Sequence, residues 1–101
     1  MVLFTNAELR AYIKTLSKNS NYIVFCEVAS VLRFTRSVNV DEIDSNASLP
    51  ARGGMMIHNY RQILKEHGFE MIHYAANRTP VHWHGEQHFL IIGVAKSILL
   101  T

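Results

Sequence analysis

Two residues of this 101-residue chain have side chains that can perform nucleophilic chemistry together, Cys26 and His88. Cys26 is the only cysteine, and it lies near the start of an apolar segment. His88 opens a second apolar run, Phe89–Val94. A thiol beside an imidazole can transfer its proton to the ring and attack a carbonyl carbon. The sequence therefore predicts Cys26 as a nucleophile and His88 as its general base, provided that the fold brings them together.

A catalytic thiol of this kind works best at the N-terminus of a helix, where the macrodipole and free amides stabilise negative charge. The β-branched and aromatic residues 22–25 favour a strand, whereas the spacing of residues 28–32 suits a buried helix. We expect a helix from near residue 22, capped by the preceding asparagine and serine residues. Side-chain amides upstream of the thiol make Asn19 and Asn21 candidate oxyanion donors.

The elements that must position these residues follow from capping and periodicity. Thr5 and Glu8 match a capping box, and helical spacing follows, which predicts an amphipathic helix over residues 6–18. A second helix is expected over 55–67, ended by Gly68. Between the helices we expect a short extended piece leading into one helical turn over 38–43 and a loop over 44–54. Strands are expected over 69–74, 81–84, 88–94 and 97–100, with a tight turn at residues 95–96. The predicted fold class is α+β in a single domain, residues 1–101, with helices on an antiparallel sheet of three or four strands.

The order of these segments carries a resemblance to a known family. Cys26 is followed by Val28–Leu32, by a glycine pair and a helix ending in Lys65–Phe69, by Pro80, and by Gln87–Val94. This order resembles the bacteriocin-processing, C39-type branch of the papain-like cysteine peptidases over roughly residues 19–100. The resemblance implies a papain-like arrangement and a thiol hydrolase acting on a peptide or amide bond, with Cys26 as nucleophile and His88 as base.

Two positions depart from the family pattern. The family usually has a small residue after its cysteine, and this chain has Glu27. The family also has an aspartate on the strand after the histidine, and residues 89–101 contain no acid or amide side chain. Without an orienting group the imidazole tautomer is poorly fixed. An inactive relative of the family is therefore the companion hypothesis.

Histidines close together near the end of the chain suggest a metal site as a second alternative. His82 and His84 flank Trp83, and alternate residues of a strand point to the same face. His73 or His88 from an adjacent strand would complete three ligands, the usual number in a catalytic zinc site. The same string resembles the metal-binding signature of rolling-circle nucleases and relaxases.

Ahead of the metal site, the leading alternative to the peptidase is a non-enzymatic protein of the inhibitor or adaptor type found in viruses and mobile elements. Such a protein would contact its partner through Trp83, Tyr74 and the histidines near Trp83. An apolar C-terminal edge strand over 97–100 would favour a homodimer or complex. The net charge of +2 is too small to indicate nucleic acid as a partner, and the basic residues are scattered rather than clustered. A single cysteine, the lack of a signal sequence and the lack of a membrane span predict a cytoplasmic protein.

Overall fold

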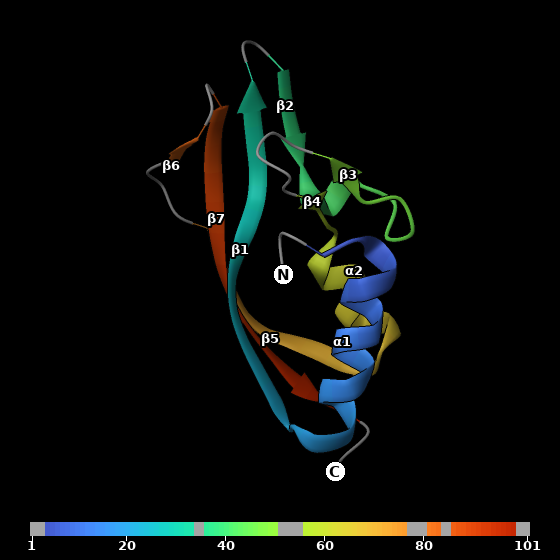
Figure 1. Ribbon diagram of the computed structural model, residues 1–101. Coiled ribbons are helices and arrows are strands. Elements are labelled where there is room, and N and C mark those ends of the chain that lie inside the picture. The colour runs from blue at the N-terminus through green and yellow to red at the C-terminus, as the bar shows by residue number, and fades with distance from the viewer. Residues whose placement is uncertain (1–3, 34–35, 51–55, 77–80, 84–85, 99–101) are drawn as a thin grey trace.

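A computed structural model of the chain describes residues 4–33, 36–50, 56–76, 81–83 and 86–98. The side chains of residues 27–33, 36–38, 76, 81, 83 and 86–89 lie outside this description. Two α-helices, one 3-10 helix and seven strands are assigned within these residues (Figure 1). In chain order they are α1 (Asn6–Asn19), β1 (Tyr22–Arg33), β2 (Arg36–Asn39), η1 (Val40–Glu42), β3 (Leu49–Pro50), β4 (Met56–Ile57), α2 (Tyr60–Glu66), β5 (Phe69–Ala76), β6 (Val81–Trp83) and β7 (Glu86–Ser97). The predicted α+β class is confirmed.

The first helix begins where its capping box predicts. The Glu8 amide donates to the Thr5 hydroxyl at 3.2 Å, and the Thr5 amide donates to the Glu8 carboxylate at 3.0 Å. Two amides that have no partner inside the helix are thereby satisfied at once. Leu9 and Ile13 are buried one turn apart on the face that meets the sheet. The prediction of an amphipathic helix here is confirmed.

The segment from residue 22 is a strand and not the helix that we expected. β1 pairs with β7 in antiparallel register from Tyr22 to Leu32, with one irregularity between Val28 and Ser30. Burial alternates along its first half, since Ile23 and Phe25 are buried while Val24 is exposed. This period of two is typical of a strand with one buried face. The strand preference of residues 22–25 therefore extends through the whole segment.

β7 is also longer than predicted. It continues through Ala95 and Lys96, where we expected a tight turn, and it ends at Ser97. Both residues are paired on both sides of the strand. Ala95 lies opposite Ile23 of β1 and Met71 of β5, and Lys96 lies opposite Tyr22 and Glu70 of the same strands. β7 is the central strand in the order β2-β1-β7-β5, and β6 pairs with its first half. Of the apolar edge strand expected over 97–100, Ser97 is instead the last residue of β7, Ile98 lies beyond that strand, and residues 99–100 lie outside the described part of the chain.

The second helix is shorter than the range 55–67. Asn59 caps it by accepting a hydrogen bond from the Gln62 amide at 3.1 Å, so that the helix begins at Tyr60. Met56 and Ile57 form β4 instead, paired with β3. Gly68 follows the helix with a φ of 83°, the left-handed conformation that favours glycine. The predicted helix end is confirmed, and the strand predicted after it is β5.

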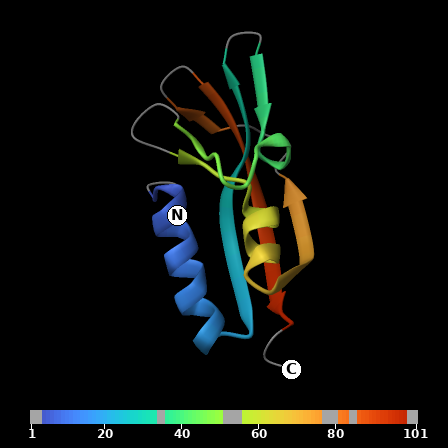
Figure 2. The same cartoon turned by 90° about the vertical axis from the view of Figure 1, so that its right-hand side faces the viewer.

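The molecule has two layers. Figure 1 shows α1 and α2 on the same side of the sheet, and Figure 2 shows α2 in front of the strands with α1 beside β1. The core lies between the layers and contains Leu9, Ile13, Ile23, Phe25, Tyr60, Ile63, Leu64, Phe69, Ile91 and Ala95. In the described part of the chain no helix covers the opposite face of the sheet, so the side chains there remain open to solvent.

Candidate functional site

Cys26 lies within strand β1, on the face of the sheet opposite the helices. Its side chain is exposed and its thiol is free. Its partner in the register is Ile92 of β7, which is 49% exposed. Because β1 is a strand, Cys26 has no helix N-terminus beneath it to stabilise a thiolate or to supply an oxyanion donor.

The register of β1 and β7 does not bring Cys26 and His88 side by side. His88 lies opposite Val31, whereas Cys26 lies opposite Ile92. Four residues along an antiparallel strand span about 14 Å, which is more than a cysteine and a histidine side chain can bridge. The side chain of His88 itself is outside the described residues. The backbone therefore favours separate positions for the two residues that the sequence nominates as a pair.

The two candidate oxyanion donors lie at one end of the sheet. Asn19 is the last residue of α1, and its side-chain amide donates to the Thr15 carbonyl at 3.4 Å. The Asn21 carbonyl accepts a hydrogen bond from the Ser97 amide at 2.7 Å. Asn21 is separated from Cys26 by five residues of extended chain, about 17 Å. Neither asparagine is positioned beside the thiol.

Two of the histidines nominated as metal ligands, His82 on β6 and His73 on β5, lie beside distant parts of β7. His82 lies opposite Gln87, and His73 lies opposite Val94, seven positions further along the same strand. Seven residues correspond to about 24 Å, far beyond the span of a zinc site. His84 and the side chain of Trp83 fall outside the described part of the chain. Within the described residues, no three acidic, histidine or cysteine side chains gather in a way that would hold a metal ion.

The exposed side of the sheet is apolar over three neighbouring strands. We define the outer face as the side chains of Tyr22, Val24, Cys26, Glu70, Ile72, His73, Ala75, Leu90, Ile92, Val94 and Lys96. The largest exposed fractions among its apolar members are 72% for Val24, 55% for Ile72 and 54% for Tyr22. The two charged members, Glu70 and Lys96, lie opposite each other in register. This patch was hidden from sequence reasoning, because it exists only once three separate strands are paired.

Tyr74 belongs to a small cluster that links β5 to its neighbours. Its hydroxyl donates to the Asp41 carboxylate at 3.3 Å, and the guanidinium of Arg61 lies 3.9 Å from its ring centroid. Burial raises the pKa of Tyr74, and the negative charge of Asp41 raises it further, to about 12. The contact of Tyr74 with a partner stays a prediction. In the structure its side chain links β5 to η1 through Asp41 and to α2 through Arg61.

A polar network joins the two helices through the loop after η1. Arg10 forms an ion pair with Glu66 at 2.9 Å and donates to the Ser45 carbonyl at 2.9 Å. The Ser45 hydroxyl donates to Glu66 at 3.0 Å. Burial raises the pKa of Glu66, but the hydrogen bonds from Arg10 and Ser45 and the Arg10 charge outweigh it, so that the pKa lies below its usual value.

The same loop contains a serine–histidine contact that sequence reasoning missed. The Ser48 hydroxyl lies 2.6 Å from Nδ1 of His58 and accepts a hydrogen bond from the Asn6 side chain at 2.9 Å. His58 is fully buried beside the Tyr60 ring. A serine and asparagine cluster over residues 44–48 is the only sequence signal for it, and such clusters usually mark loops. Ser48 thereby links this loop to α1 through Asn6 and to the segment before α2 through His58.

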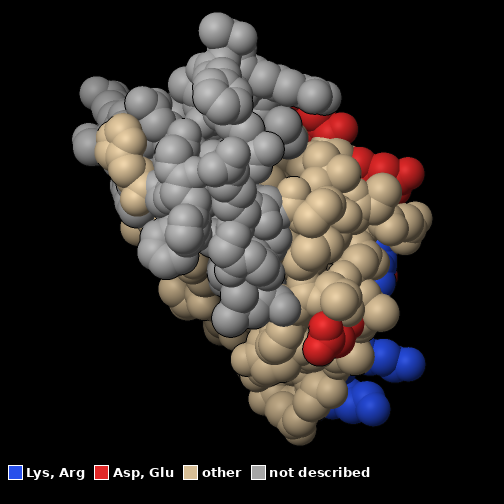
Figure 3. Space-filling view, turned by 45° about the horizontal axis from the view of Figure 1, so that its top comes forward, with Lys and Arg blue, Asp and Glu red and all other residues tan. Residues whose placement is uncertain are grey.

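Comparisons with protein-family models, with curated proteins and with solved structures found no match. The resemblance to C39-type peptidases therefore stays a prediction from short motifs. No helix in the described residues is long and apolar enough to cross a membrane. On the face drawn in Figure 3, acidic and basic side chains lie along one rim of the described surface, and most of the remainder is uncharged.

Proposed function

We propose that this chain is a non-enzymatic protein-interaction module whose outer face packs against a second copy of the chain. The observation that supports it is the exposure of Val24, Ile72, Tyr22 and Ile92 on adjacent strands. Contiguous apolar surface of this kind marks sites of protein association. A sheet covered by helices on one side alone completes a second core when another sheet packs on its open side.

The charge pattern of the outer face favours a copy of itself as the partner. Glu70 and Lys96 are direct neighbours across the strands, so their charges offset each other. Two identical faces then meet without a net charge to repel them. A two-fold interface needs such a self-compatible surface, because each patch meets the same patch.

Sedimentation equilibrium across micromolar to near-millimolar concentrations tests the proposal. One chain has a mass of 11.5 kDa, and we expect the wild type to approach twice that mass as its concentration rises. Val24→Lys and Ile92→Lys place like charges on both sides of the interface and should leave a monomer. Leu49→Lys is the matched control, since Leu49 is 40% exposed on β3, away from the outer face.

Circular dichroism first confirms that each variant is folded, so that a change in mass reports on association and not on unfolding. A wild type that stays monomeric throughout overturns the self-association proposal. A wild type that dimerises equally well with Val24→Lys and Ile92→Lys overturns the assignment to the outer face. A different protein partner on this face would appear as a monomer that nevertheless loses a co-purifying chain on Val24→Lys substitution.

The thiol hydrolase is the second candidate, and the exposed, free thiol of Cys26 is the observation that favours it. It requires His88 to approach Cys26 across about 14 Å of strand. Alkylation by iodoacetamide across pH measures the reactivity of the thiol. Rapid alkylation well below pH 8, abolished in His88→Ala, would revive this hypothesis, because only a paired thiol is activated there.

A further inference from the structure

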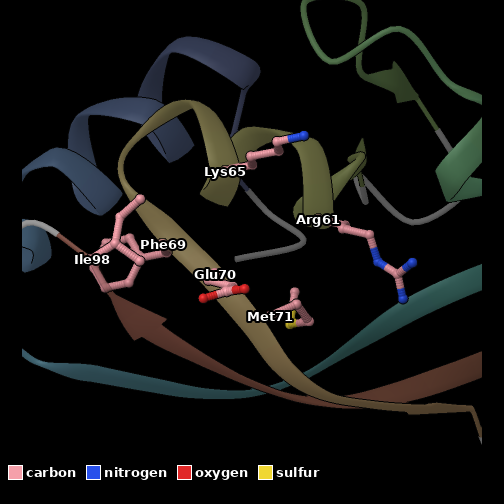
Figure 4. A pocket seen from close by; sticks show the side chains of 6 residues that line it. All are labelled: Arg61, Lys65, Phe69, Glu70, Met71 and Ile98. Atoms are coloured by element: carbon pink, nitrogen blue, oxygen red, sulfur yellow. The ribbon is translucent and has the colours of Figure 1, made fainter.

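A hollow of about 440 Å³ lies between α2 and β5 (Figure 4). Its apolar lining comes from Phe69, Met71 and Ile98, and its charged rim from Arg61, Lys65 and Glu70. Figure 4 shows Arg61 and Lys65 extending from α2, with the other side chains along β5 and at Ile98. Its volume lies within the range of pockets that bind ligands.

The rim of this hollow has an excess of positive charge. Arg61 and Lys65 are four residues apart on α2, so both side chains lie on one side of the helix. Among the described residues neither has a carboxylate within 4.0 Å, and the recorded ion pair is Arg10–Glu66. The Tyr74 ring beneath the Arg61 guanidinium, at 3.9 Å, restricts where that charge lies. The charge of Glu70 is offset by Lys96 opposite it.

The hollow adjoins an open strand edge. β5 pairs with β7 along one side, and in the described chain no strand pairs along its other side. Apart from the ladder with β7, no backbone hydrogen bond is recorded for Glu70–Ala76 within that description. The unpaired amides and carbonyls of an edge strand are a template for an added strand.

We infer that the free edge of β5 binds an extended acidic segment of another protein as an added strand. One carboxylate of the segment lies between Arg61 and Lys65. An apolar side chain two residues away on the same face enters the hollow over Phe69 and Met71. Residues two apart on a strand are separated by about 7 Å, which fits a carboxylate and an apolar group side by side. This site goes beyond the proposed function and does not depend on the outer face.

Fluorescence anisotropy with a labelled peptide tests the inference on the full chain. The probe alternates threonine with leucine and glutamate in turn, so that leucine and glutamate share one face of the extended peptide. The first comparison peptide has lysine in place of each glutamate. The second has the acidic sequence with alternate backbone amides methylated, which removes strand hydrogen bonds while keeping the side chains. We expect the acidic peptide to bind at least about tenfold more tightly than either comparison peptide.

Two protein variants locate the site. The double variant Arg61→Gln with Lys65→Gln should weaken the acidic peptide by about tenfold or more. The matched control is Lys14→Gln with Lys18→Gln, which removes the same charge from an exposed part of α1. That control should leave the affinity unchanged, because it alters net charge equally without touching the hollow.

Four results would each overturn the inference, three of them with peptides. One is equal affinity for the acidic and lysine peptides, and another is equal loss of binding in both double variants. The third is equal binding of the methylated peptide, which would exclude strand addition. Dodecanoate is a further probe, and its binding without any peptide binding would also overturn the inference, since the hollow would then take a single amphiphilic anion. These variants change no residue of the outer face, so a difference in peptide affinity between them is not caused by an altered outer face.

Discussion

At the scale of single residues, Phe25 and Gly93 pack closely against each other in the core. The two lie opposite each other on β1 and β7, and a Cβ at Gly93 would come within 3.0 Å of three atoms of the Phe25 ring. The ring cannot retreat freely, because the Tyr60 ring lies on it with a centroid distance of 5.8 Å. The absence of a side chain at Gly93 is therefore a packing requirement.

We predict that Gly93→Ala destabilises the fold by about 1–3 kcal/mol, the usual result of overpacking a core. Urea denaturation followed by circular dichroism measures the change. Lys96→Ala on the same strand is the control, and it should change stability by less than about 0.5 kcal/mol as an exposed substitution. An unaltered midpoint for Gly93→Ala would show that the Phe25 ring has room to move.

Residue-level predictions succeeded where the determining contacts are close in sequence. The Thr5–Glu8 capping box needs only residues three apart, and it forms as predicted. The left-handed Gly68 depends on the helix directly before it. The predicted pairing of Cys26 with His88 depends instead on which residues of β1 and β7 align, and a shift of four positions separates them. No local pattern fixes such a register before the strands pair.

At the scale of elements, the clearest failure of prediction is β1. The apolar spacing of residues 28–32 is compatible with a helix, and only pairing along the whole of β7 decides for a strand. Ala95 and Lys96 were likewise expected to form a turn, but they are held in a strand by pairing with β1 and β5, whose residues lie more than twenty positions away in the sequence. Long-range pairing overrides local preference in both segments.

The same scale contains the network that fixes α1 to α2. Arg10 is 23% exposed and Glu66 34% exposed, so solvent weakens their attraction only in part. We predict that Arg10→Leu lowers stability by about 1–2 kcal/mol at pH 7, since the Ser45 carbonyl and Glu66 both lose a charged donor. Lys14→Leu on the exposed side of α1 is the control.

The pH dependence of this variant follows from the lowered pKa of Glu66. A carboxyl with a lowered pKa in the folded state stabilises the fold above its unfolded value of about 4.5 and loses that contribution as pH falls. The difference between wild type and Arg10→Leu should therefore shrink between pH 5 and pH 3. Urea midpoints at both pH values measure it, and a constant difference would exclude the ion pair as its cause.

At the scale of the whole molecule, the sequence predicted the α+β class but not the topology. With β7 at the centre, the described residues leave free edges on β5 and on the first half of β1, as well as on the outer sides of the short strands β2 and β6. The outer face stays uncovered by any described helix. The separate edge strand expected to drive association is not formed at Ser97, which belongs to β7, and its residues 99–100 lie outside the described part of the chain. The surfaces available to partners are therefore properties of the assembled sheet, which no single segment displays.

Cys26 reports on the outer face because its thiol lies among the apolar residues of that face. If two copies pack there, the rate of alkylation by iodoacetamide at fixed pH falls as protein concentration rises, since the dimer excludes the reagent. In Val24→Lys the rate should be independent of concentration, and in Leu49→Lys it should follow the wild type. Mass spectrometry of timed samples measures the modified fraction. A wild-type rate that does not change between dilute and concentrated protein would contradict packing of the outer face against a second copy.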